Sequence, residues 1–188
     1  MNKRQAVPYG LLLIVFLLWI YLKPQDESIA PVEHHPSYIA YQLENTRFDE
    51  FGDLTLQIYA AKATNYTDKG ITLFEDLKVV FYIVDKEENS TTIWQASSDK
   101  GILTDNNNKL LLSNNVWVKN LSLDQLVQTM NTEKLTILLA EKELSTDLLV
   151  KWQGPQMRQQ GIGMWASLVS EELIVKKQVK AIYLNENK

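Results

Sequence analysis

The chain has 188 residues, of which 45% are hydrophobic and 22% are charged, and its net charge at pH 7 is −4. This mildly acidic balance argues against nucleic acid as a partner, because the aromatic residues are not interleaved with clusters of Lys and Arg. The sequence contains no cysteine, so an exported domain of this length has to rely on its hydrophobic core rather than on disulfides.

The first predicted element is an N-terminal membrane anchor. Lys3 and Arg4 precede an apolar run at residues 7–22, which ends at Lys23 and Pro24. As a helix with about 1.5 Å of rise per residue, the run covers roughly 24 Å, slightly less than the hydrocarbon thickness of about 30 Å. The core of a cleaved signal peptide is therefore the alternative.

The flanking residues favour an uncleaved anchor. Trp19 and Tyr21 suit the far membrane interface, and Lys23 can extend its ammonium group to water. Pro31 directly follows the nearest small-x-small cleavage candidate, residues 28–30, and peptidases tolerate proline badly there. Because the positive charges precede the helix, the chain after residue 24 is predicted to lie outside the cytoplasm, in a compartment that in a bacterium is the periplasm. The predicted segments are a cytoplasmic N-terminus at 1–6, a transmembrane helix at 7–22, a tether at 23–37, a β-domain at 38–184 and a tail at 185–188.

Beyond the tether, the apolar residues alternate with a period of two, which is typical of half-buried strands and predicts an all-β domain. The alternating runs are Leu54, Leu56, Ile58 and Ala60; Leu77, Val79 and Phe81; Leu110, Leu112, Val116 and Val118; Leu135, Ile137 and Leu139; and Val179, Ala181 and Tyr183. Turn compositions separate the runs at residues 67–70, 85–90, 105–109, 140–143 and 159–161. Residues 121–128 have weak helical spacing, with a wide loop as the alternative.

A weak internal repeat, Leu followed six residues later by Val, fits the chain four times. The matches are Leu73 to Val79, Leu110 to Val116, Leu144 to Val150 and Leu173 to Val179. Each unit has the length of a hairpin, and hairpins bury their apolar faces only by stacking on their neighbours. The repeat therefore predicts a jelly roll or a β-solenoid, although any β-sandwich produces some such alignment by chance.

An ordered set of motifs follows the single anchor: Ala60-Ala61-x-Ala63, the segment 94–105 (WQASSDKGILTD), the run 110–118, Ser145-Thr146-Asp147 and Gly161-Ile162-Gly163-Met164. In order and spacing this set resembles the LptC family of bacterial lipopolysaccharide export proteins. The resemblance covers nearly the whole chain. It implies a twisted, open β-jelly roll anchored in the inner membrane, without catalytic activity and without a cofactor.

The resemblance also implies the cargo and the partners. The domain would take lipopolysaccharide from an inner-membrane ABC transporter, LptF and LptG with the ATPase LptB, and pass it to the periplasmic jelly-roll protein LptA. The physics is consistent, because each acyl methylene exposed to water costs about 0.8 kcal/mol and an apolar groove removes that cost.

The expected groove is lined by residues at repeat positions or on the strand faces beside them. These are Leu56, Ile58, Phe74, Val79, Phe81, Leu112, Val116, Val118, Ile137, Val150, Leu173, Val175 and Tyr183. Ordinary packing in a closed core is the alternative for each of them. In a regular strand, Phe74 would point to the face opposite to that of Leu77, because three positions separate the two residues. A bulge at residues 75–76 would return Phe74 to the inner face.

The two edges of an open sheet are the expected partner sites, because unpaired N–H and C=O groups there can pair with another sheet. The N-terminal edge, residues 37–48, would meet the transporter, and the C-terminal strand, residues 173–184, would meet LptA. The lysines at 176, 177 and 180 would alternatively protect the edge from aggregation. The edge residues singled out are Tyr38, Tyr41, Thr46, Gly154, Val179, Ala181 and Tyr183.

Catalytic and metal-binding motifs are poorly represented. The two histidines, His34 and His35, are adjacent and lie in the tether, which suits neither helical nor strand spacing of a metal pair. Ser97-x-x-Lys100 lacks the partner motifs of penicillin-binding proteins. Two other classes remain open: a membrane-tethered structural β-domain with a closed core, and an anchored cell-wall hydrolase, for which no cleft of carboxylates can be assembled.

Overall fold

The computed structural model describes residues 35–85, 90–104, 106–122, 127–155 and 157–183. The predicted cytoplasmic N-terminus, transmembrane helix at 7–22, C-terminal tail and nearly all of the tether lie outside these ranges. Within them, no helix has the length and hydrophobicity that crossing a bilayer requires.

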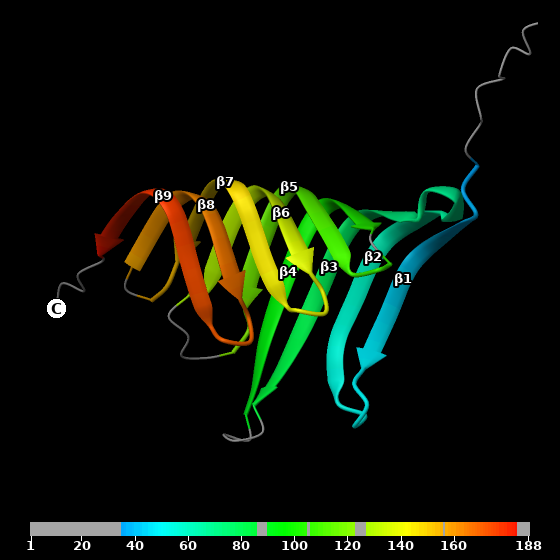
Figure 1. Ribbon diagram of the computed structural model, residues 1–188, viewed down its shortest axis with the longest axis horizontal. Coiled ribbons are helices and arrows are strands. Elements are labelled where there is room, and N and C mark those ends of the chain that lie inside the picture. The colour runs from blue at the N-terminus through cyan, green and yellow to red at the C-terminus, as the bar shows by residue number, and fades with distance from the viewer. Residues whose placement is uncertain (1–34, 86–89, 105, 123–126, 156, 184–188) are drawn as a thin grey trace, which may run out of the picture. The chain divides into compact units, whose positions relative to one another are not determined.

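The described chain folds as one antiparallel sheet in which every strand pairs with the next along the sequence (Figure 1). β1 and β9 do not pair with each other in the described part, so the sheet is open at both edges. The all-β class is confirmed, and the consecutive antiparallel pairing excludes a solenoid. The strands are β1 (Tyr38–Phe48), β2 (Leu54–Tyr66), β3 (Ile71–Asp85), β4 (Ser90–Thr104), β5 (Lys109–Asn120), β6 (Thr129–Leu138), β7 (Glu143–Gln153), β8 (Met157–Ser167) and β9 (Glu172–Tyr183), with one short 3-10 helix, Thr67–Lys69.

Most strands are bent near their middle, and the bends are aligned across the sheet. The pairing register breaks between Ser113 and Val116 in β5 and between Thr146 and Leu149 in β7. Left-handed residues lie at the same level, including Asp76 with φ 51° and Asn114 with φ 64°. Because a bulge bends its strand and increases its twist, a line of bulges folds the sheet back on itself.

The bends divide the sheet into two halves that face each other across one core. Layer A comprises residues 43–48, 54–60, 77–85, 90–97, 116–120, 129–132, 150–153, 157–160 and 180–183, and layer B comprises residues 38–41, 62–66, 71–75, 100–104, 109–113, 134–138, 143–146, 162–167 and 172–177. Buried residues of both layers form one hydrophobic cluster, as Val79 of layer A and Leu110 of layer B illustrate. The core therefore lies between the layers rather than between two separate sheets.

Phe74 returns to the inner face as expected, but through a bend of β3 rather than through a bulge. The β2–β3 register is unchanged from Ala60 opposite Leu77 to Lys62 opposite Glu75, and Asp76 between them is unpaired in the left-handed region. As a result Phe74 is 4% exposed and Leu77 is 1% exposed, although they are three positions apart. An aspartate accepts this φ more readily than a bulky residue would.

The internal repeat corresponds to alternate strands. Its four matches lie on β3, β5, β7 and β9, and each spans the bend of its strand. The repeating unit is therefore one odd-numbered strand with its even-numbered neighbour.

The turn predicted at 159–161 is wrong, because these residues lie inside β8. A Cβ at Gly161 would overlap the side chain of Val175 on β9. The glycine is thus required by close strand packing at a register break rather than by a turn.

Candidate functional site: the space between the layers

The expected groove residues lie together on the inner faces of the two layers. Ten of them are buried in the core: Leu56, Ile58, Phe74, Val79, Phe81, Leu112, Val116, Val118, Ile137 and Val150. Leu173 and Val175 on β9 are half-buried and pack against this core. Tyr183 ends β9, and its side chain lies outside the described part of the structure.

Two small cavities lie in this interior, one near each edge of the sheet. The N-terminal cavity, about 220 Å³, is lined by Leu43 and Ile58 of layer A and by Phe74 of layer B, among others. The C-terminal cavity, about 100 Å³, is lined by residues that include Trp94 and Leu173. Both are smaller than the roughly 300–1,000 Å³ typical of small-molecule sites, so the protein's own side chains fill most of the interior.

The connection between the layers permits them to separate. The described ladder hydrogen bonds join sequential strands, so the layers are linked covalently at the bends and otherwise by side-chain contacts. Among the described residues, a side-chain hydrogen bond crosses the opening from Lys142 Nζ in the β6–β7 turn to the carbonyl oxygen of Tyr82 at 3.3 Å. Parting the layers at their free ends would therefore break no β-ladder.

Lys142 supplies a pH-dependent test of this crossing contact. Burial lowers the pKa of its ammonium group, while the carboxylate of Asp49 acts weakly in the opposite direction. At pH values between the folded and the unfolded pKa of Lys142, the unfolded chain binds more protons than the folded domain. The contribution of Lys142 to the free energy of unfolding therefore rises as the pH rises toward 10.5, the ordinary pKa of a lysine. Lys142→Met should remove that gain, which urea unfolding of both proteins at pH 7 and pH 10 measures. An identical pH dependence of stability in the variant would contradict the buried position of the ammonium group.

Two hydrogen-bond donors are buried without a partner near the C-terminal cavity. Trp94 Nε1 and Asn120 Nδ2 make no hydrogen bond with any described residue. The two residues are opposite each other in the β4–β5 ladder, and Trp94 lines the cavity. Because buried polar groups are normally satisfied, such donors are available to a ligand oxygen such as an ester or amide carbonyl.

Several interior residues were not anticipated from the sequence. Met130, Leu144, Trp152 and Met164 are all at most 4% exposed and belong to the same core. Leu144 opens the third match of the repeat, and Trp152 stands two residues after Val150. The repeat itself marks Leu144, and extending the alternation one step beyond Val150 would have found Trp152.

The expected edge residues lie at both free edges, with one exception. Tyr38, Tyr41 and Thr46 are exposed on β1, and Val179 and Ala181 are exposed on β9. Gly154 is buried in the β7–β8 turn, where its N–H donates to the carbonyl oxygen of Met157 at 2.9 Å. Within the described ranges, no group of three or more His, Asp or Glu side chains is placed to hold a metal ion.

Comparison with known proteins decides the family. The model of the family "Lipopolysaccharide-assembly, LptC-related" matches residues 10–184. The chain belongs to the LptC-related family. The lipopolysaccharide export system protein LptC of Haemophilus influenzae is 27% identical over 200 residues, which cover 97% of this chain and 95% of that protein. The resemblance read from the ordered motifs is therefore confirmed.

The solved structures support the same fold. LptH of Pseudomonas aeruginosa, the LptA-homologous periplasmic component of a lipopolysaccharide transport device, matches with a TM-score of 0.51. The match covers 68% of this chain and 93% of LptH at 7% sequence identity, so it shows a common fold alone. As an LptC-related protein, the chain is a non-enzymatic component of lipopolysaccharide transport.

Proposed function

We propose that this protein is held in the inner membrane by residues 7–22 and conducts lipopolysaccharide between layers A and B. The observation that carries the proposal is a predominantly apolar inner surface in a sheet whose two edges do not pair with each other in the described part. Acyl chains placed there are shielded from water at about 0.8 kcal/mol per methylene. The donors of Trp94 and Asn120 suit the carbonyl groups that link acyl chains to sugar.

The two edges give the transfer its direction in this proposal. β1 would pair with the periplasmic part of an ABC transporter formed by LptF and LptG with the ATPase LptB, and β9 would pair with LptA. Addition of strands at both edges would extend the apolar surface from one protein into the next. ATP hydrolysis in the separate transporter would supply the driving force.

The filled interior sets a requirement for this function. Because the described cavities hold only about 220 and about 100 Å³, a lipid with several acyl chains enters only when the layers part. The same filled interior is what a membrane-tethered structural domain would show, which makes that the second candidate function.

Lipid co-purification separates the two candidates. The full chain, extracted from its own cells in a mild detergent, should carry lipopolysaccharide. Leu173→Asp, which places a charge at the C-terminal cavity, should lose most of it, whereas Ile174→Asp on the exposed face of the same strand should keep it. Absence of lipopolysaccharide from the folded wild-type protein would favour the structural candidate.

A further inference from the structure

The outward face of layer A carries a row of basic side chains on an otherwise acidic protein. The register places Lys78, Trp117, Lys151 and Lys180 in one cross-strand row, and Lys119 and Arg158 in the next. Glu44, opposite Tyr59 at the β1 end, is the acidic residue in these two rows. These two rows therefore carry a net positive charge, although the whole chain has a net charge of −4.

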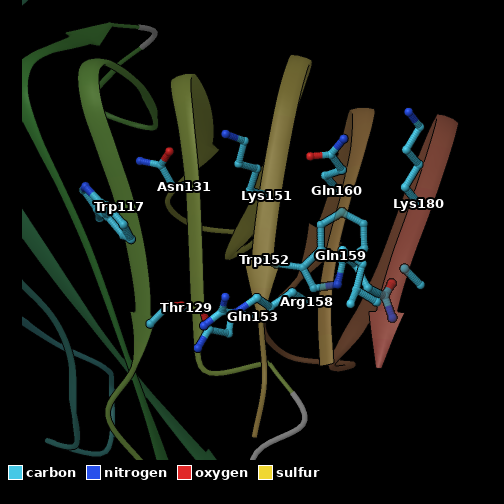
Figure 2. Close-up of a pocket in the computed structure, with 12 residues that line it drawn as sticks. Trp117, Thr129, Asn131, Lys151, Trp152, Gln153, Arg158, Gln159, Gln160 and Lys180 are labelled. Atoms are coloured by element: carbon cyan, nitrogen blue, oxygen red, sulfur yellow. The ribbon is translucent and has the colours of Figure 1, made fainter. Parts of the chain in front are cut away.

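The β5–β9 part of this face is hollowed (Figure 2). The outer hollow, as we name it, has a volume of about 920 Å³ and is lined by Trp117, Asn131, Lys151, Arg158, Gln160 and Lys180, among others. It lies mainly on the face opposite the core, because Trp117 is 43% exposed while Val116 and Val118 are at most 2% exposed. The buried Trp152 of the core also contributes to its lining. Its volume falls in the range of about 300–1,000 Å³ that is typical of ligand sites.

The charges in the outer hollow are not neutralised by the protein. Lys151, Arg158 and Lys180 form no ion pair with any residue of the described ranges, and no described Asp or Glu lines the hollow. The acidic residues of the same strands lie elsewhere: Glu133 and Asp147 at the bend, and Glu143 and Glu172 in layer B. Asp147 already pairs with Lys176 at 2.8 Å. Three cations held close together without a counter-charge favour the binding of an anion.

The lining of the outer hollow offers contacts for phosphate oxygens, for sugar hydroxyls and for a flat apolar surface. The Arg158 guanidinium matches phosphate oxygens in a two-point geometry, and the two lysines add point charges. The amides of Asn131 and Gln160 can both donate to and accept from sugar hydroxyls. Trp117 offers an exposed flat apolar surface at one side of the hollow, as Figure 2 shows.

We propose that the outer hollow binds a phosphorylated saccharide. The inference deepens the proposed function and rests on it for the source of the ligand, which would be the sugar-phosphate part of the lipid cargo. The acyl chains and the sugar phosphates would then contact opposite faces of the same strands.

Binding is measured by calorimetry on the full chain in a non-ionic detergent. The probe is the acyl-free phosphorylated oligosaccharide released from lipopolysaccharide, compared with its dephosphorylated form and with inorganic phosphate. The triple variant Lys151→Gln/Arg158→Gln/Lys180→Gln should weaken binding about tenfold or more, because it removes three charge-assisted contacts. The matched control, Lys100→Gln/Lys109→Gln/Lys134→Gln, removes equal charge from layer B and should leave binding unchanged.

Two further comparisons test the phosphate contacts and the aromatic contact separately. Removing the phosphates or replacing Trp117 by alanine should also weaken binding. Equal affinity for inorganic phosphate and for the oligosaccharide would overturn the saccharide assignment. Unchanged binding in the Lys151/Arg158/Lys180 variant, or binding only to vesicles that contain phosphatidylglycerol, would overturn the proposal. The probe has no acyl chain, so its failure to bind would leave the co-purification result, and hence the proposed function, standing.

Discussion

The Ile137→Asp variant is expected to accumulate little folded protein. Ile137 lies in β6 with 0% exposure at the centre of the core between the layers. A carboxylate there has to be buried without a partner or protonated at a cost, and changes of this kind exceed about 4 kcal/mol. That loss is comparable with the whole stability of a typical domain, about 5–15 kcal/mol. Urea unfolding and the yield of soluble protein would measure it.

The neighbouring residue is the control for Ile137→Asp. Thr136 is half-buried on the opposite face of the same strand, so Thr136→Asp should change the free energy of unfolding by less than about 1 kcal/mol. Equal effects of the two substitutions would mean that the buried face of β6 is misassigned.

The second large effect is expected at the bend of β3. Phe74→Ala removes a buried ring beside the N-terminal cavity and should lower the free energy of unfolding by about 3–5 kcal/mol. Leu73 lies in the outward row of layer B with Thr64 and Ile102, so Leu73→Ala should cost much less. A regular β3 without the left-handed residue at Asp76 would reverse this order, which chemical denaturation of the two variants decides.

The sequence contains enough information for the class of fold and for most of the interior. Strict alternation in β2, β5 and β6 identifies inner faces that the structure also buries, and the broken parity at Phe74 indicates an irregularity in β3, which the structure places at Asp76. The repeat anticipates the pairing of successive strands, because a hairpin unit needs its neighbour to bury its apolar face.

The layers themselves could not be predicted from the sequence. The fold of the sheet depends on aligned bends, and the residues there, such as Gln42, Asp76 and Asn115, look like ordinary polar strand or turn residues. Their left-handed φ values follow from tertiary packing rather than from local preference. Gly161 was misinterpreted for the same reason, since its neighbour Val175 belongs to another strand.

The outer hollow was also invisible in the sequence. Its cations, Lys151, Arg158 and Lys180, come from three strands and are separated along the chain by turns. Only the cross-strand register places Lys151 opposite Gln160, and Gln160 opposite Lys180. A search for clusters of basic residues along the chain therefore finds no such face.

The conduction of lipid between the layers is tested most directly by photo-crosslinking in living cells. A benzophenone side chain at Phe74 keeps an aromatic ring at the N-terminal cavity, and one at Leu173 lies at the C-terminal cavity. Gln57 and Ile174, on outward faces of β2 and β9, are the controls. The account predicts lipopolysaccharide adducts at Phe74 and Leu173 and none at the controls. Folded protein at normal levels without adducts at the inner positions would contradict it.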